Sequence, residues 1–305
     1  GIGPPIACLP TLADAIARRP RAAVVANPSS LHAGTATALV EAGIPVLVEK
    51  PVTTTAAACA ALAETAERQS VPVAVVQQMR FHPLLAALRR SLDDGLVGRV
   101  GAVVGVQGEH LADWQPGTDH RQSYAARPEL GGGVLLTQNH LLDLMVHLCG
   151  APQEVSALLD HPKVLGLDVE EAVAAIGVLP TGALWSLRAD YHARPRRFVL
   201  DVEGSHGRAR LDHYASTLTV TDGAGEVVRA ESTPFDRVLL FRAVLEDFLA
   251  AVDGGAAPRC PLADALEVLA VIEAIRRSAV DGRRCAPAPT PPPSPASPGA
   301  GHVLP

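Results

Sequence analysis

The stretch AAVVANPSSLHAGTATALVEAGIPVLVEKP, residues 22–51, decides the fold. Its first five residues are apolar and stop at Asn27-Pro28, which is typical of a short buried strand. Residues 45–48 form a second apolar run that ends at Glu49-Lys50-Pro51. The alanine-rich segment between the two runs has the length and composition of a helix. The stretch therefore predicts a strand–helix–strand unit.

The helix inside this unit has a start signal and a stop signal. Ser29 or Ser30 can accept a backbone N–H bond and cap a helix that runs to about Glu41. Gly43 follows that helix and tolerates the positive φ with which many helices end.

A second unit of the same kind follows. A threonine within residues 53–55 can cap a helix that runs to about Arg68, and residues 71–76 form another apolar strand. Strands that alternate with helices over short links predict a parallel sheet covered by helices. Ligands of such sheets lie beyond the carboxyl ends of the strands. The residues expected at these ends are Asn27-Pro28, Glu49-Lys50-Pro51 and Gln78-Met79-Arg80.

The second half of the chain has a different pattern. Apolar and polar residues alternate over 99–107, 167–178, 182–192, 196–203, 208–212 and 216–221. This alternation, broken by turn signals, predicts a largely antiparallel sheet. Helical patterns occur at 134–149, 236–252 and 262–281. The last of these helices places Leu262, Leu266, Leu269, Ile272 and Ile275 on one face.

The predicted fold class is α/β, with a partial doubly wound parallel-sheet (Rossmann) domain followed by an α+β domain with a large, mostly antiparallel sheet. The expected boundaries are 1–98 for a truncated dinucleotide-binding domain and 99–283 for a substrate-binding and oligomerisation domain. Residues 284–305 are expected to be a disordered tail, because eight of the twenty residues 286–305 are proline.

Composition excludes several classes of protein. The chain has 305 residues, a formal net charge of −6 and 48% hydrophobic residues, which do not suggest a nucleic-acid-binding or membrane-surface protein. Its five cysteines are scattered and form no C-x-x-C pair, so a zinc ribbon and a dithiol redox site are both disfavoured. Scattered thiols are typical of a cytoplasmic protein. Only Lys50 and Lys163 are lysines among 26 basic residues, so a function that requires lysine is expected of at least one.

The beginning of the chain lacks a phosphate-binding turn. Gly1-Ile2-Gly3 follows no strand, Ile6 stands where the third glycine of G-x-G-x-x-G belongs, and Pro4-Pro5 remove two amide donors. The expectation is that the chain starts after the first βαβ portion of its domain, through truncation or genuine loss.

Taken together, the motifs resemble those of the glucose–fructose oxidoreductase / inositol dehydrogenase (Gfo/Idh/MocA) family, over roughly residues 10–285. The segments that carry the resemblance are ANPSSLH (26–32), VEKP (48–51), QMRFHP (78–83), ELGGGVL (129–135), HLLD (140–143) and DYHARPRR (190–197). Residues 113–124 resemble a subgroup found in bacterial surface-sugar pathways. The resemblance implies oxidation of a ring hydroxyl to a ketone, or the reverse, with hydride exchanged with NAD or NADP.

Lys50 and His140 are the candidate catalytic residues. A lysine near a cationic nicotinamide loses its proton more easily and can act as the base, and a histidine can shuttle that proton. The alternatives are an ordinary surface lysine and a buried structural histidine bonded to Asp143. A metal site on His140, Asp143 and His147 is disfavoured, because zinc ligands usually come from more elements. Many family members carry an aspartate four residues before this histidine, where Leu136 stands here.

The resemblance also implies binding residues. The candidates for the cofactor are Asn27, Pro28, His32, Glu49, Gln78 and Arg80, and those for the substrate are Trp114, Arg121, Tyr124, Asn139 and Asp143. It further suggests a cis bond before Pro51. Helix initiation remains the alternative for residues 27–32, pairing with an acidic neighbour for Arg80, and a core anchor for Trp114.

The predicted function is NAD(P)-dependent interconversion of a hydroxyl and a ketone on a sugar, cyclitol or nucleotide-sugar. The alternative is a catalytically inactive sugar-binding or subunit-interaction protein that has lost its dinucleotide site. No metal, nucleic acid or membrane is expected as a partner. The resemblance implies a homodimer or homotetramer.

Overall fold

The computed structural model describes residues 6–160 and 163–290, and the predicted proline-rich tail lies largely outside this range. The first half forms a parallel sheet of three strands, β1 (Ala23–Val25), β2 (Val46–Val48) and β3 (Val73–Val75), in that order. The helices α2 (His32–Glu41) and α3 (Ala56–Gln69) alternate with the strands. Both strand–helix–strand units of the prediction are confirmed. The first strand is not buried as predicted, because β1 lies at the edge of this sheet and Val24 is 59% exposed.

The helix termini show which local signals were correct. Neither Ser29 nor Ser30 caps a helix, because a short 3₁₀ turn, η1 (Ser29–Leu31), leads directly into α2 without a side-chain cap. That prediction is wrong. The hydroxyl of Thr55 does cap α3, accepting the backbone N–H of Ala58 at 3.2 Å. Gly43 follows α2 with a φ of +75°, as expected of a helix stop.

The second half forms an eight-stranded sheet in the order β11-β10-β9-β8-β4-β7-β6-β5. Its strands are β4 (Val100–Gly108), β5 (Glu154–Leu159), β6 (Ala172–Val178), β7 (Leu184–Asp190), β8 (Arg197–Gly204), β9 (Gly207–Asp212), β10 (Thr217–Asp222) and β11 (Val227–Ser232). Only β4 and β7 pair in parallel, so the predicted mostly antiparallel sheet is confirmed. The prediction missed β5 and β11, the two edge strands. No residue of β11 is fully buried, so this strand lacks the alternation of apolar and polar residues from which strands are predicted.

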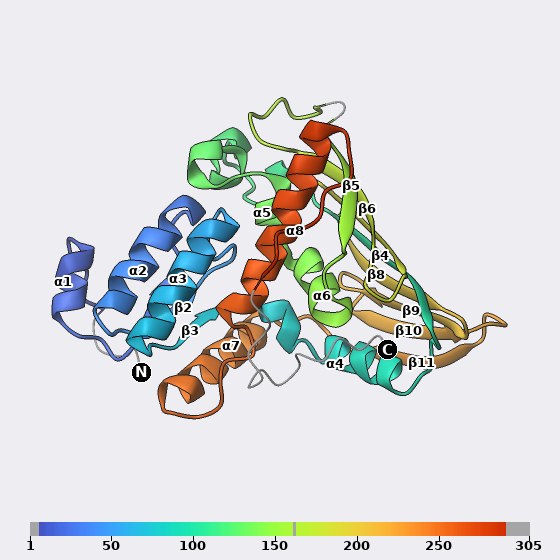
Figure 1. Ribbon diagram of the computed structural model, residues 1–305, viewed down its shortest axis with the longest axis horizontal. Coiled ribbons are helices and arrows are strands. Elements are labelled where there is room, and N and C mark those ends of the chain that lie inside the picture. Colours follow the sequence, from blue (N-terminus) through green and yellow to red (C-terminus); the bar gives the residue numbers. More distant parts are fainter. Residues whose placement is uncertain (1–5, 161–162, 291–305) are drawn as a thin grey trace.

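Helices cover one face of this large sheet (Figure 1). The covering helices are α4 (Pro83–Asp93), α6 (His140–Cys149) and α8 (Leu262–Asp281). The small helix α1 (Leu12–Ala17) lies apart from them, at the far end of the molecule. α8 runs between the two sheets and contacts both α3 and β5. All five residues predicted for its apolar face are buried. α7 (Arg237–Val252) returns to the first sheet, where Val244 and Phe248 pack against Leu47 and Ala74.

The predicted helix 134–149 is two helices. α5 (Val134–Thr137) ends at Gln138, whose backbone leaves the helical region with φ −104° and ψ 35°, and α6 then begins at His140. Four short 3₁₀ turns lie in the connection before α5: η3 (Leu111–Asp113), η4 (His120–Gln122), η5 (Tyr124–Ala126) and η6 (Pro128–Leu130). A further turn, η2 (Gln78–Phe81), follows β3. At the break between α5 and α6, the carbonyl of Thr137 accepts a hydrogen bond from Nζ of Lys50, and His140 is the first residue of α6.

Within the described residues, no helix is long and apolar enough to span a membrane.

Candidate functional site

The carboxyl ends of β1, β2 and β3 border a cavity of about 640 Å³. Its wall contains Ala26, Asn27, Pro28, Ser29, His32, Glu49, Lys50 and Gln78 from the first half, Tyr124 and His140 from the second, and Phe235, Arg237 and Phe241 at the start of α7. Eight of the predicted site residues therefore meet at one cavity: Asn27, Pro28, His32, Glu49, Lys50, Gln78, Tyr124 and His140.

Lys50 follows β2 and points at the break between α5 and α6. Its Nζ donates to the backbone carbonyl of Thr137 at 2.6 Å. Burial lowers the pKa of Lys50 to about 8; Glu49 opposes this shift and the positive charge of Arg237 adds to it. The peptide bond from Lys50 to Pro51 is cis, as the resemblance implies. A lysine with this pKa exists in both protonation states near neutral pH, which suits a group that takes up and returns a proton.

His140, the first residue of α6, lies between two glutamine side chains. Its Nδ1 lies 3.3 Å from Oε1 of Gln77, and its Nε2 lies 3.3 Å from Nε2 of Gln78. The two contacts agree if Nδ1–H donates to the Gln77 oxygen and Nε2 accepts from the Gln78 amide. Burial and the positive charge of Lys50 hold the pKa of His140 well below its usual value, so the ring is neutral.

Thr137, whose carbonyl binds Lys50, is held in place through its side chain, which contacts Tyr191. The hydroxyl of Thr137 donates to Gly133 O at 2.9 Å and also contacts the phenol oxygen of Tyr191. Tyr191 is fixed through its own backbone, whose N–H donates to the carbonyl of Glu171 at 2.8 Å. Since Tyr191 and Thr137 are both buried, this support is shielded from water.

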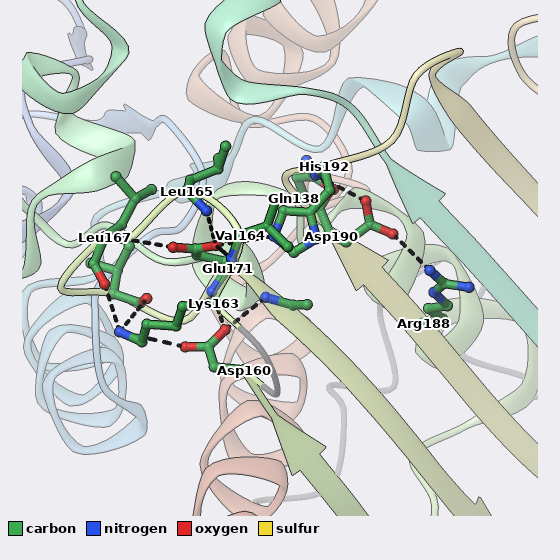
Figure 2. Close-up of polar contacts among 12 residues, drawn as sticks. Gln138, Asp160, Lys163, Val164, Leu165, Leu167, Glu171, Arg188, Asp190 and His192 are labelled. Atoms are coloured by element: carbon green, nitrogen blue, oxygen red, sulfur yellow. Dashed lines mark hydrogen bonds and ion pairs between the residues drawn. The ribbon is translucent and has the colours of Figure 1, made fainter.

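Glu171 in turn is held by a loop that closes around its carboxylate (Figure 2). The backbone N–H groups of Val164, Leu165 and Leu167 donate to that carboxylate at 2.7–2.8 Å. Nε2 of His192 lies 3.1 Å from it as well. Burial raises the pKa of Glu171, but these hydrogen bonds outweigh it and the pKa lies below its usual value. The charged carboxylate thus joins this loop to Glu171, and the carbonyl of Glu171 binds the backbone of Tyr191.

His32 links the ends of two strands of the first sheet. Its Nε2 lies 2.7 Å from the carbonyl of Asn27 after β1, and its Nδ1 lies 2.8 Å from the carbonyl of Pro51 after β2. The ring is buried and also lines the cavity. Helix initiation, the alternative for residues 27–32, therefore does not explain the two contacts of the His32 ring.

The cavity has unsatisfied acceptors that a nicotinamide dinucleotide could satisfy. Oδ1 of Asn27 and Oε1 of Gln78 are buried and have no hydrogen-bond partner. Both residues line the cavity. Such a ligand carries a carboxamide and ribose hydroxyls that can donate to these oxygens, and buried acceptors are normally satisfied. The residues present therefore fit NAD or NADP.

Three predicted ligand contacts lie elsewhere. Nε and Nη2 of Arg80 donate to both carboxylate oxygens of Asp143, at 2.8 and 2.6 Å, and Nη1 contacts Asp264. Arg80 and Asp143 are almost fully buried, and neither lines the cavity. Their charges satisfy each other, as in the alternative of pairing with an acidic neighbour. Asn139 lies beside them, and its carbonyl accepts the backbone N–H of Asp143 at 2.8 Å.

The predicted polar-aromatic loop reaches the site only in part. Trp114 lines a second cavity of about 700 Å³, whose wall also includes Glu109, Arg196, His213 and Tyr214. Its ring also contacts Tyr191 edge-on, with centroids 5.7 Å apart. Arg121 is exposed and lines neither this cavity nor the first. Phe235 and Arg237 line both cavities, so the two are neighbours.

The sequence prediction did not identify several residues of the site. They are Gln77, Thr137, Tyr191, Phe235, Arg237 and Phe241. The helix that begins at Arg237 was predicted, but nothing local indicates that it returns to the first sheet. Gln77 precedes the predicted site residue Gln78, and Thr137 lies two residues before the predicted Asn139. Among the described residues, no cluster of His, Cys, Asp and Glu could hold a metal ion.

A parallel sheet with a lysine, a histidine and unpaired amide oxygens at its carboxyl edge defines a nucleotide-dependent oxidoreductase of the Rossmann class. Comparison with known families agrees with this. Residues 6–77 match the model described as oxidoreductase family, NAD-binding Rossmann fold, and residues 85–210 match the model of the GFO/IDH/MocA C-terminal domain. The chain belongs to the Gfo/Idh/MocA family of oxidoreductases, and its cofactor is NAD or NADP.

The similar proteins act on sugars and cyclitols. Myo-inositol dehydrogenase Hyg17 of Streptomyces leeuwenhoekii is 29% identical over 281 residues, covering 89% of this chain and 82% of that protein. Levoglucosan dehydrogenase of Pseudarthrobacter phenanthrenivorans is 23% identical over 209 residues, covering 60% of this chain and 53% of that protein. The chain thus matches about half the length of that relative. A solved levoglucosan dehydrogenase, in complex with NADH and levoglucosan, has a TM-score of 0.76 at 22% identity, covers 87% of this chain and 80% of its own, and shares its fold.

Proposed function

We propose that the chain interconverts a secondary hydroxyl and a ketone on a sugar, cyclitol or nucleotide-sugar, with Lys50 as the acid–base group. The observation that carries this proposal is the environment of Lys50. Its amine is buried at a cavity on the carboxyl edge of the parallel sheet, has a pKa near 8 and bonds only a neutral carbonyl within the described residues. The dehydrogenase names of the relatives support the same reading.

In this mechanism, Asn27 and Gln78 would hold NAD⁺ or NADP⁺, which would supply the acceptor for the hydride of the carbinol carbon. Lys50, as the neutral amine, accepts the hydroxyl proton, so that the C–O bond becomes a carbonyl as the O–H and C–H bonds break. The backbone carbonyl of Thr137 orients the amine by accepting a hydrogen bond from it. In the reverse direction the Lys50 ammonium returns the proton to the forming hydroxyl.

His140 completes the acid–base pair in this proposal. Its ring is neutral and is held on both sides by Gln77 and Gln78. The Nε2 lone pair, which otherwise accepts from the Gln78 amide, can take a proton from the Lys50 ammonium, and the low pKa of the ring favours its release toward the cavity. Asn27 and Gln78 bind the cofactor through their unpaired oxygens. His32, Pro28 and Glu49 complete the cofactor wall, and Tyr124 lies on the substrate side.

The test is a screen of neutral sugars, uronates, inositols and nucleotide-sugars, with NAD⁺ and NADP⁺, followed by NAD(P)H absorbance. Turnover of at least one ring hydroxyl, lost in the Lys50→Arg variant, is the expected result. Sugar binding without turnover of any compound would instead favour the inactive sugar-binding alternative.

We also propose that the uncovered face of the large sheet joins two copies of the chain. Leu158, Ile176 and Leu184 lie on adjacent strands, share that face in the observed register and are 64–69% exposed. An apolar patch of neighbouring side chains on a sheet face is typical of an interaction site. A homodimer or homotetramer is the expected assembly.

A further inference from the structure

Arg237 stands at the boundary of the two cavities. It is the first residue of α7 and lines both walls, together with Phe235. Its guanidinium lies over the ring of Phe241, with the central carbon 5.3 Å from the ring centroid. Among the described residues, no carboxylate pairs with it and no acceptor takes a hydrogen bond from it. Within this part of the chain, Arg237 therefore lines both cavities without an ion pair of its own, although Glu49 is an acidic residue in the wall of the first.

The second cavity has an excess of positive charge. Arg196 and Arg237 line it, and Glu109 is its one acidic residue. Glu109 is already engaged: Arg196 lies 3.6 Å from its carboxylate, and the hydroxyl of Tyr214 donates to it at 3.4 Å. His213 adds no charge near neutral pH, because burial lowers its pKa to about 4. Arg237 is thus the cation that remains uncompensated.

The same cavity offers flat apolar surfaces beside this charge. Trp114, Tyr214 and Phe235 line it, and the guanidinium of Arg196 lies 4.3 Å above the ring of Tyr214. Aromatic rings bind the C–H faces of sugars, and a guanidinium binds carboxylates and phosphates with two parallel hydrogen bonds. Rings and a free guanidinium in one wall suit a sugar that bears an anion.

Arg237 is also close enough to act on the candidate catalytic pair. Its charge contributes to the lowered pKa of both Lys50 and His140. The site therefore holds the positive charges of Arg237 and protonated Lys50 near one another, which is unfavourable. A bound anion at Arg237 would offset this repulsion, so an acidic ligand gains affinity that a neutral one lacks.

We propose that Arg237, assisted by Arg196, binds an anionic group of the substrate, so that the substrate is an acidic sugar carrying a carboxylate or a phosphate. This inference rests on the proposed function and specifies its substrate class. Arg237 is then the specificity-determining residue of the second cavity. Arg196 contributes less, because Glu109 already shares its charge.

The test compares sugars that differ in one substituent. D-glucose, D-glucuronate and D-glucose 6-phosphate share a ring and differ at carbon 6, and a galactose series and myo-inositol with its monophosphate extend the comparison. Binding is measured by calorimetry and by tryptophan fluorescence. Of the two tryptophans in the chain, Trp185 is buried in the core, so a ligand in the second cavity reports through Trp114. This readout does not require turnover.

The expected result is that, in at least one series, an acidic member binds about tenfold more tightly than its neutral partner, with a preference that weakens as salt increases. A carboxylate and a phosphate are told apart by which acidic member binds more tightly. In Arg237→Met the preference for the acidic over the neutral member disappears. Arg242→Met is the matched control, because Arg242 lies on the same helix, pairs with Glu246 and lines neither cavity. Its preference should be unchanged.

Equal affinity for neutral and acidic members, or no acidic member bound at 10 mM or below, would overturn the inference. So would an acid preference that survives in Arg237→Met. Binding that is tighter for acids without turnover would support the inference and contradict the proposed function. Turnover of neutral sugars without any preference for acidic ones would support the proposed function and contradict the inference.

Discussion

Nζ of Lys50 donates to the backbone carbonyl of Thr137 at 2.6 Å, across the junction between the two sheets. A carbonyl orients the amine without the full negative charge that would stabilise the ammonium form. The carboxylate of Glu49, next in sequence, accepts the backbone N–H of Lys50 at 3.1 Å instead of its amine. Lys50 is thus held in place and still able to lose its proton.

Replacing Lys50 with arginine should nearly abolish turnover. Arginine keeps the charge and the long stem but does not deprotonate at working pH, and loss of a general base costs about 10²–10⁴-fold in rate. The measurement is kcat on the best substrate of the screen, with circular dichroism and a melting curve to verify folding. Most of the activity surviving in a folded Lys50→Arg protein would make the lysine structural.

His140→Asn is the comparison for that variant. It should cost less than Lys50→Arg, because His140 relays the proton and does not remove it from the substrate. If kcat fell as much in His140→Asn as in Lys50→Arg, or more, the base would be His140 and Lys50 the relay.

The rate should depend on pH through Lys50. Oxidation needs the neutral amine, so its rate should rise with pH through about 8 and level off above, whereas reduction needs the ammonium and should fall over the same interval. His140 does not contribute a step near neutral pH, because its pKa lies well below the usual value. The residual rate of Lys50→Arg should lack the step. A profile flat from pH 6.5 to 9.5 in both directions, with chemistry rate-limiting, would contradict the assignment.

Much of the fold could be predicted because its signals are local. The strands β1 to β3 are short apolar runs that alternate with helices, and the central strands of the large sheet alternate because only one face is covered. The prediction failed where local sequence carries no such signal. β11 is an exposed edge strand, and the break at Gln138 divides a segment that has no glycine or proline to mark it.

Local pattern alone predicted the site only where it follows the strand ends, whereas His140 and Tyr124 were predicted from the family resemblance. Lys50, His32 and Gln78 are near strand ends, and topology brings such ends together. Arg80 occupies an equivalent position, but its partner depends on how α6 and α8 pack, which local sequence does not reveal. Arg237 enters the site for the same kind of reason, through the docking of α7.

Asp143→Asn should weaken folding and leave ligand binding unchanged. The variant leaves Arg80 buried without its main partner, and breaking a buried ion pair on one side costs about 3–5 kcal/mol. Urea unfolding measures this loss, and cofactor titration of the folded fraction should give an unchanged Kd. Asp264→Asn is the matched control, since the Asp264 side chain is 21% exposed and should cost less. A normal stability with a raised KM would restore Asp143 to the substrate-binding set.

Glu171→Gln should remove part of the stability of the protein above pH 5. The folded pKa of Glu171 is lowered, so its contribution is complete above the ordinary pKa of a glutamate and is lost as the pH falls through the folded value. The loss on substitution should therefore be larger at pH 7 than at pH 3.5, as measured by urea unfolding. Glu129→Gln, on an exposed carboxylate paired with Arg127, should change stability little at either pH. A Glu171→Gln loss independent of pH would mean that the charge does not hold the loop.

Ile176→Arg should convert the assembly to monomers. Ile176 lies in the middle of the uncovered face, with Leu158 and Leu184 on the strands to either side, and is 64% exposed in the single chain. A charge there costs little in the free chain, because the side chain already meets water, but in an assembly it would be buried against a second copy without a partner. Light scattering at micromolar concentration should give a dimer or tetramer for the parent chain and a monomer for the variant, with equal melting curves in dilute solution. Val238→Arg, on a 76% exposed position of α7 away from this face, is the control and should leave the assembly intact. A parent chain that scatters as a monomer, or a variant that assembles normally, would remove this face from consideration as the interface.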